Sequence, residues 1–208
     1  MLRIDHVVYA VRDLDEAAAR FRSEYGLGSV AGGRHPGWGT GNRIVPLGDQ
    51  YIELLCVVDA PEARGSEFGR TMLAFLEPGD RPFAICAGTD DLDDVAARLG
   101  LAVTEGSRTR PDGRTLAWRG AGLDAPQRDP SMPFFIEWSL PSRDLHPGRM
   151  SADHDAPATG IAWVEVSGNA DRLSEWLGGA DLPVRVVDGE PAFRAFALTT
   201  MTGELVIR

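Results

Sequence analysis

Three side chains in short apolar runs have the chemistry of a metal centre. His6 lies in IDHVVYAV, Glu53 in YIELL and Glu137 in FFIEW. One imidazole and two carboxylates suit a divalent ion such as Zn, Mn, Ni or Fe, and three ligands leave positions open for a substrate. Glu53 or Glu137 could also carry a proton in catalysis. The alternative is that a mid-strand Glu faces solvent on the open side of a sheet.

The runs that carry these residues belong to an internal repeat. DLDEAAARF from Asp13 and DLDDVAARL from Asp91 both follow an apolar run and precede a later run with one Glu. Aligning the copies matches Glu53 with Glu137 and places Ala84 where His6 stands. A repeat of this length indicates two copies of one supersecondary unit, with a shared site between them.

Each copy predicts a strand, a helix and three strands. Alternation of apolar residues predicts strands, and Asp before an Ala-rich stripe predicts a capped helix. Residues 141–159, rich in Pro, Asp and Gly, predict a linker. Residues 160–208 repeat the order of elements as a third, degenerate unit, with Glu204 in the place of Glu53. An open sheet there would need to pack against the first two units, in residues 1–140, or against a second copy in a homodimer.

Further residues are candidates for a substrate pocket. His35, Trp38 and Asn42 lie in the Gly-rich passage GGRHPGWGTGN, which predicts either the mouth of a pocket or a surface hairpin. Arg114 and Trp118 lie on a predicted strand, where Arg could bind a substrate carboxylate and Trp could form an apolar wall.

Composition excludes several classes of protein. The 208 residues carry a net charge of −10 and no lysine, which argues against a nucleic-acid surface, an anionic membrane and lysine-dependent cofactor chemistry. Cys56 and Cys86 lie in apolar runs and are interpreted as buried thiols. The first residues show no secretory signal and no run approaches the roughly 20 apolar residues of a membrane helix, so a cytoplasmic location is expected.

Taken together and in this order, IDHVVYAV, GGRHPGWGTGN, YIELL, DGRTLAW and PFFIEW resemble the glyoxalase-like domain proteins of the vicinal oxygen chelate superfamily. The resemblance implies an α+β fold in which repeated βαβββ units form a cupped, mostly antiparallel sheet with helices outside. It also implies metal ligands at His6, Glu53, Ala84 and Glu137, of which Ala84 cannot bind a metal.

These residues support two hypotheses of function. The first is a metalloenzyme of lyase or isomerase type that transfers protons on a carbonyl-bearing small molecule. The second is a metal-free protein that binds a small molecule in the cup, which Ala84 favours. His146, nine residues after Glu137, is either a replacement ligand that folds back or a solvated linker residue.

Overall fold

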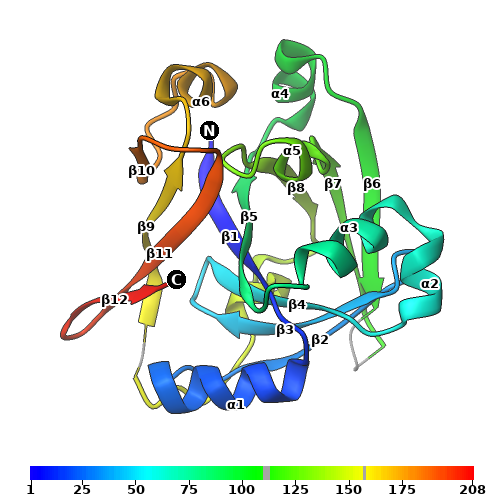
Figure 1. Cartoon of the computed structure of the whole chain (residues 1–208), viewed down its shortest axis with the longest axis vertical. Coiled ribbons are helices and arrows are strands. Elements are labelled where there is room, and N and C mark those ends of the chain that lie inside the picture. Colours follow the sequence, from blue (N-terminus) through cyan, green and yellow to red (C-terminus); the bar gives the residue numbers. More distant parts are fainter. Residues whose placement is uncertain (110–112, 157) are drawn as a thin grey trace.

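A computed structural model describes residues 1–109, 113–156 and 158–208, and for residues 108 and 109 it describes the backbone alone. The chain forms an eight-stranded closed barrel and a separate four-stranded sheet (Figure 1). The strand order around the barrel is β1-β4-β3-β2-β6-β7-β8-β5. The predicted α+β fold with repeated βαβββ units is confirmed, and its sheet is mostly antiparallel, with parallel pairs at β1–β4 and β5–β8.

Two modules with the same order of elements build the barrel. The first comprises β1 (Arg3–Ala10), α1 (Leu14–Tyr25), β2 (Val30–His35), β3 (Thr40–Pro46) and β4 (Tyr51–Val57). The second comprises β5 (Arg81–Gly88), α4 (Leu92–Leu99), β6 (Val103–Thr109), β7 (Thr115–Ala121) and β8 (Phe134–Ser139). Between the modules lie α2 (Ala60–Gly65) and α3 (Glu67–Phe75), and α5 (Ala125–Arg128) joins β7 to β8.

The repeated helices begin and end for the same physical reasons. The Asp13 side chain accepts hydrogen bonds from the backbone N–H groups of Asp15 and Glu16, and Asp91 does the same for Asp94. Gly26 ends α1 with φ of 68°, and Gly100 ends α4 with φ of 64°. Glycine tolerates this left-handed conformation, which lets its N–H bond the last turn of the helix.

Residues 158–207 form the second sheet, in the predicted order of strand, helix and three strands. Its elements are β9 (Ala158–Ser167), α6 (Ala170–Trp176), β10 (Val184–Val187), β11 (Ala192–Thr200) and β12 (Gly203–Ile207). The strand order is β10-β9-β11-β12, so β9 pairs in parallel with β10, whereas β1 pairs in parallel with β4. The element order therefore matches the barrel modules, but the strand pairing does not.

One face of the second sheet covers the outside of the barrel. Phe196 of β11 is fully buried in the same apolar core as Val7 of β1 and Ile85 of β5. The Tyr9 hydroxyl donates a 3.0 Å hydrogen bond to the backbone carbonyl of Arg208. Glu204 lies on this sheet, where it accepts a hydrogen bond from the Trp163 indole, whereas Glu53 lies on a strand of the barrel.

The segment expected to be a linker instead folds against the barrel. It contains two short 3₁₀ turns, η1 (Arg143–Leu145) and η2 (Pro147–Arg149). The carbonyl of Gly148 accepts a 2.9 Å hydrogen bond from the N–H of Gly48, and Arg143 and Arg149 both bind Asp49. Gln50 donates to the Ile4 carbonyl and accepts from the Ile161 N–H, so its amide joins the barrel to the second sheet.

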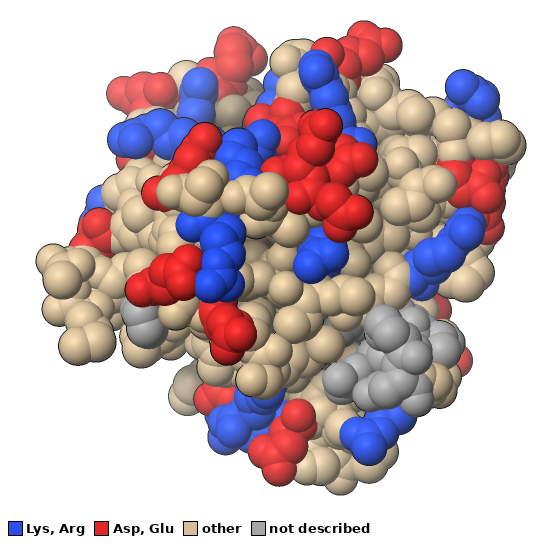
Figure 2. Space-filling model, turned by 90° about the horizontal axis from the view of Figure 1, so that it is seen from below, with Lys and Arg blue, Asp and Glu red and all other residues tan. Residues whose placement is uncertain are grey.

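Charged side chains on the surface lie largely beside partners of opposite sign. The face seen in Figure 2 carries acidic and basic residues interspersed over its described part. Two ion pairs of α1 illustrate this arrangement, Arg22 with Asp155 and Arg43 with Asp15. Within the described ranges, no helix is both long and apolar enough to span a membrane.

Candidate functional site

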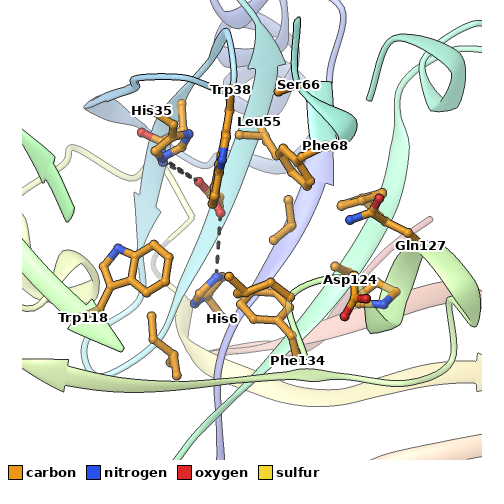
Figure 3. A pocket seen from close by; sticks show the side chains of 18 of the residues that line it. His6, His35, Trp38, Leu55, Ser66, Phe68, Trp118, Asp124, Gln127 and Phe134 are labelled. Atoms are coloured by element: carbon orange, nitrogen blue, oxygen red, sulfur yellow. Dashed lines mark hydrogen bonds and ion pairs between the residues drawn. The ribbon is translucent and has the colours of Figure 1, made fainter. Parts of the chain in front are cut away.

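The barrel encloses a cavity of about 340 Å³ (Figure 3). Alternate residues of the strands face it, because side chains alternate across a sheet. Tyr51, Glu53 and Leu55 enter from β4, and Phe134, Ile136 and Trp138 enter from β8. Helices α3 and α5 close one side with residues that include Phe68 and Gln127. The cavity is mostly apolar, with polar groups concentrated at one place.

That polar place centres on the Glu53 carboxylate. The Nε2 atom of His6 lies 3.7 Å from Oε2 of Glu53, and the Nε2 atom of His35 lies 3.8 Å from Oε1 (dashed lines in Figure 3). The Asn42 amide donates a 2.5 Å hydrogen bond to the same Oε1 atom. Strands β1, β2, β3 and β4 thus each supply one polar side chain to a single point of the cavity wall.

Asp5 fixes which nitrogen of His6 faces the cavity. Its Oδ1 atom lies 2.7 Å from Nδ1 of His6, and its Oδ2 atom accepts a 3.1 Å hydrogen bond from the Trp138 indole. Burial raises the pKa of the Asp5 carboxyl, but hydrogen bonds from His146 and His6 outweigh it and hold that pKa below its usual range. An ionised Asp5 accepts the Nδ1 proton of His6, so in the neutral imidazole the acceptor nitrogen is Nε2, which faces Glu53.

A break in strand register brings Asp5 and His6 to the same network. Neighbours on a regular strand point to opposite faces, but the pairing of β1 with β5 shifts between Ile4 and His6. Such a bulge redirects a side chain. Asp5 is 2% exposed and His6 is 3% exposed, so both groups need buried partners, and each has them.

Like His6, His35 has its Nε2 atom facing the Glu53 carboxylate. Its Nδ1 atom lies 3.0 Å from the Thr40 hydroxyl, and its Nε2 atom lies 3.5 Å from the Asn42 amide nitrogen, a donor. The Asn42 amide therefore lies as a donor between the His35 imidazole and the Glu53 carboxylate, and the His6 imidazole faces the other carboxylate oxygen. Two His and one carboxylate is a donor set that divalent transition metals accept, so the chemistry of these residues suits such an ion. Their ligand atoms do not form a close cluster, since within the described residues the group with all ligand atoms inside 4.8 Å of one another is Asp5, His6 and Cys86.

Glu137 does not belong to this group, and the prediction that it would meet His6 and Glu53 is corrected. Its carboxylate accepts a 2.9 Å hydrogen bond from Arg119 and lies 3.4 Å from the N–H of Leu92, on the outside of the barrel. The reason is alternation along β8, where Ile136 and Trp138 take the inward positions. Ala84, in the repeat position of His6, lines the cavity without offering a ligand.

The other pocket candidates separate into two groups. His35, Trp38, Asn42 and Trp118 line the cavity. Arg114 is exposed and is not among the cavity-lining residues. The charged side chains that the described part of the chain places along the cavity are, besides histidine, the carboxylates of Glu53, Glu67 and Asp124.

Asp5, His6 and Cys86 form a buried cluster, with potential ligand atoms within 4.8 Å of one another. Burial, followed by the nearby charges of Asp5 and Glu53, raises the pKa of the Cys86 thiol well above its usual value. Asp5 already accepts hydrogen bonds from three side chains. We therefore interpret these residues as a group that holds the His6 ring in place and not as a metal site. Asp5 was not among the site residues predicted from the sequence, although its position directly before His6 could have indicated a partner for that histidine.

Comparison with known proteins identifies the family. Residues 4–180 match the family model described as a glyoxalase-like domain. The chain belongs to the glyoxalase-like domain family. This family lies within the vicinal oxygen chelate superfamily, as the repeated motifs predict. Comparison with curated protein sequences gave no match.

A solved structure shares the fold of the whole chain, and others are similar over part of it. A hypothetical protein from Staphylococcus aureus is 17% identical, with a TM-score of 0.72 over 100% of this chain and 99% of that one. Methylmalonyl-CoA epimerase from Mycobacterium tuberculosis is 20% identical, with a TM-score of 0.45 over 65% of this chain and 86% of that one. A Streptomyces coelicolor methylmalonyl-CoA epimerase (Q60A) in complex with 2-nitronate-propionyl-CoA is 20% identical, with a TM-score of 0.48 over 66% and 98%. The first comparison extends over the second sheet, so the whole architecture recurs in another protein.

Proposed function

We propose that this glyoxalase-like protein is an enzyme that binds one divalent ion at His6, His35 and Glu53 and moves a proton on a carbonyl-bearing small molecule. The observation that supports this most is the meeting of two imidazole Nε2 atoms with one carboxylate inside an apolar cavity. His35 replaces Glu137 in the ligand set expected from the sequence, because Glu137 lies outside the barrel.

Zn, Mn, Ni and Fe all accept nitrogen and carboxylate ligands, and a bound ion would supply Lewis-acid polarisation of a carbonyl oxygen. The protein's own groups have separate tasks. Asp5 holds the His6 ring and Asn42 holds Oε1 of Glu53. The Oε2 atom of Glu53 is then placed to take a proton from the carbon beside the carbonyl while the C–H electron pair moves toward the carbonyl oxygen. Return of the proton to a different position gives an isomer of the substrate without a change in redox state.

The cavity walls indicate the kind of substrate. Aromatic side chains form much of the lining, and the rings of Trp38 and Phe68 lie 5.0 Å apart at one wall. Such walls suit a small molecule with a flat or apolar body. Arg114, the arginine expected to bind a substrate carboxylate, is exposed and does not line the cavity, so recognition by this arginine is not part of the proposal. The polar end of the substrate is expected to meet the His6–Glu53–His35 group.

The second hypothesis is a metal-free binding protein of the same fold. It is favoured by Ala84, which occupies the repeat position of His6 and offers no ligand. Under this hypothesis the Asn42 amide, which donates to Glu53, and the Asp5–His6 hydrogen bond hold these polar groups in place without an ion. The two hypotheses differ in whether purified protein binds a divalent ion at one site.

The test combines elemental analysis with calorimetric titration of Zn²⁺, Mn²⁺, Ni²⁺ and Fe²⁺, followed by deuterium exchange at the carbon beside the carbonyl in a panel of oxo-acids and hydroxy-ketones. We expect one ion per chain and exchange that requires it. Exchange should stop in Glu53→Gln and continue in Glu137→Gln. Binding of panel members without any ion or exchange would support the binding-protein hypothesis and overturn the enzyme proposal.

A further inference from the structure

A buried hydrogen-bond chain continues from the cavity to the segment that joins the barrel to the second sheet. Oδ1 of Asp5 binds His6, and Oδ2 lies 3.2 Å from the Nε2 atom of His146. His146 stands between η1 and η2 and is 8% exposed. It is neither a solvated linker residue nor a ligand at Glu53, since its Nε2 atom is directed at Asp5.

The backbone donor at the far end of this hydrogen-bond chain indicates where the proton of His146 lies. The backbone N–H of Gly148 lies 3.2 Å from Nδ1 of His146, so Nδ1 is the acceptor of that ring. The proton of neutral His146 is therefore on Nε2, where it is donated to Asp5. Asp5 in turn accepts from Nδ1 of His6. Both histidines thus donate to Asp5, one to each carboxylate oxygen, so each of these buried N–H groups has an acceptor.

The rings along this chain are held by packing as well as by hydrogen bonds. Tyr51 stacks on the His6 ring at 4.3 Å between centroids and contacts the His146 ring edge-on at 5.7 Å. Trp138 contacts His146 edge-on at 5.4 Å and also donates to Asp5. Gly148 admits no side chain, because a Cβ atom there would lie 2.3 Å from the Gln50 carbonyl oxygen. The segment is thus fixed at the position from which His146 reaches Asp5.

We propose that His146 is a positioning residue for the candidate centre and acts through Asp5 to hold His6 with its proton on Nδ1 and its acceptor nitrogen, Nε2, facing Glu53. The consequence for ion binding rests on the function proposed above. The statement about the His6 proton does not, because it concerns the ion-free protein. Partners behind a ligating histidine typically change metal affinity by about 10- to 100-fold when removed.

Substitution of His146 by asparagine or by glutamine distinguishes a hydrogen bond to Asp5 from a purely structural role in holding the 3₁₀ segment. The Asn amide reproduces the place of Nδ1 and can accept from Gly148 without reaching Asp5. The Gln amide reproduces the place of Nε2 and can donate to Asp5. His154→Asn is the matched control, because His154 lies on the same segment and accepts from Gly28 rather than binding Asp5.

The experiment measures the ¹⁵N shifts of the His6 ring in ion-free protein, and then Co²⁺ affinity with its visible spectrum. In wild type, His146→Gln and His154→Asn, we expect a protonated Nδ1 and unprotonated Nε2. His146→Asn should give a mixture of tautomers and about tenfold weaker Co²⁺ binding. Unchanged His6 shifts in His146→Asn would overturn the proposal.

Asp5→Asn provides a second variant if His146→Asn does not fold. Its amide can donate to Nδ1 of His6, so the proton should move to Nε2, and unchanged shifts would again overturn the proposal. If wild-type protein binds no Co²⁺, the proposed enzyme function fails, while the nitrogen shifts still decide the role of His146.

Discussion

The Asn42 amide binds the Glu53 carboxylate at 2.5 Å, from the strand next to the one that carries Glu53. This bond needs space behind Asn42, and Gly32 of β2 provides it. A Cβ atom at Gly32 would lie 1.9 Å from Oδ1 and 2.8 Å from Cγ of Asn42. The glycine is required here for room, in contrast to Gly37 and Gly39 of the following turn, whose φ angles are 82° and 69°.

Gly32→Ala should therefore displace the Asn42 side chain from Glu53. We expect weaker binding of ion and ligand, together with a loss of about 1–3 kcal/mol in the free energy of unfolding from overpacking. Urea unfolding and calorimetric titration measure the two effects. Gly65→Ala is the control, because its Cβ atom would meet nothing within 4 Å. Equal behaviour of the two variants would contradict this role of Gly32.

Glu53→Gln should abolish or strongly weaken divalent-ion binding, by more than the 10- to 100-fold typical of outer partners. The fold should persist, since Gln keeps the size of the side chain and the barrel core lies elsewhere. Glu137→Gln should leave ion binding unchanged and cost about 0.2–1 kcal/mol through its partly exposed pair with Arg119. Stronger loss of ion binding in Glu137→Gln than in Glu53→Gln would reverse the assignment of the site.

Both cysteines should resist alkylation in the folded protein. Cys86 is 0% exposed and Cys56 is 4% exposed. Burial, the leading cause, raises the pKa of Cys56 to about 11 and that of Cys86 well above its usual value, so little thiolate is present near pH 8. Mass spectrometry after iodoacetamide treatment should show no adducts in native protein and two adducts in urea. Rapid labelling of Cys86 without denaturant would disprove the buried position of that thiol.

His154 should make stability depend on pH. Burial, the largest effect, lowers its pKa in the folded state, and its Nδ1 atom accepts a hydrogen bond from Gly28. The unfolded chain then takes up the proton first as pH falls below about 6.5. The stabilisation present above that pH is lost on further acidification toward the folded-state pKa. Urea midpoints between pH 7.5 and 5.5 should fall less in His154→Asn than in wild type, and parallel curves would contradict this.

Removal of residues 141–208 should destabilise the barrel. The truncated chain would expose the outer apolar faces of β1 and β5, which β11 covers with residues such as Phe196, and would lose His146. We expect a lower melting temperature and association of the exposed faces, measured by calorimetry and sedimentation, which also give the oligomeric state of the full chain. A truncated protein that stays monomeric and as stable as the full chain would show that residues 160–208 form an independent domain.

The sequence predicted the barrel modules because their signals are local. Asp13 and Asp91 cap helices in both copies, and the strands follow from alternation. The site was only partly predictable, since a shift of one position along a strand moves a side chain from the inner face of the barrel to the outer face. In YIELL the Glu shares the inner face with Tyr51, whereas in FFIEW it shares the outer face with Phe135. Matching Glu53 with Glu137 by residue type concealed that reversal. The inward position of His146 depends on long-range contacts that composition does not encode.

The place of β1 in the barrel has a consequence for how the site is assembled during folding. His6 pairs with Tyr51 on one side of the strand, and Arg3 pairs with Gly88 on the other. The hairpins β3–β4 and β6–β7 need only short loops, so they can form early. Strand β1 pairs with β4 and β5, which are distant in sequence, so two long loops must close, at a cost in entropy, before these pairings contribute to stability. His6 is therefore expected to reach Glu53 only in the slow phase of refolding. The chemistry of this protein should appear with the closing of the barrel and not with its secondary structure.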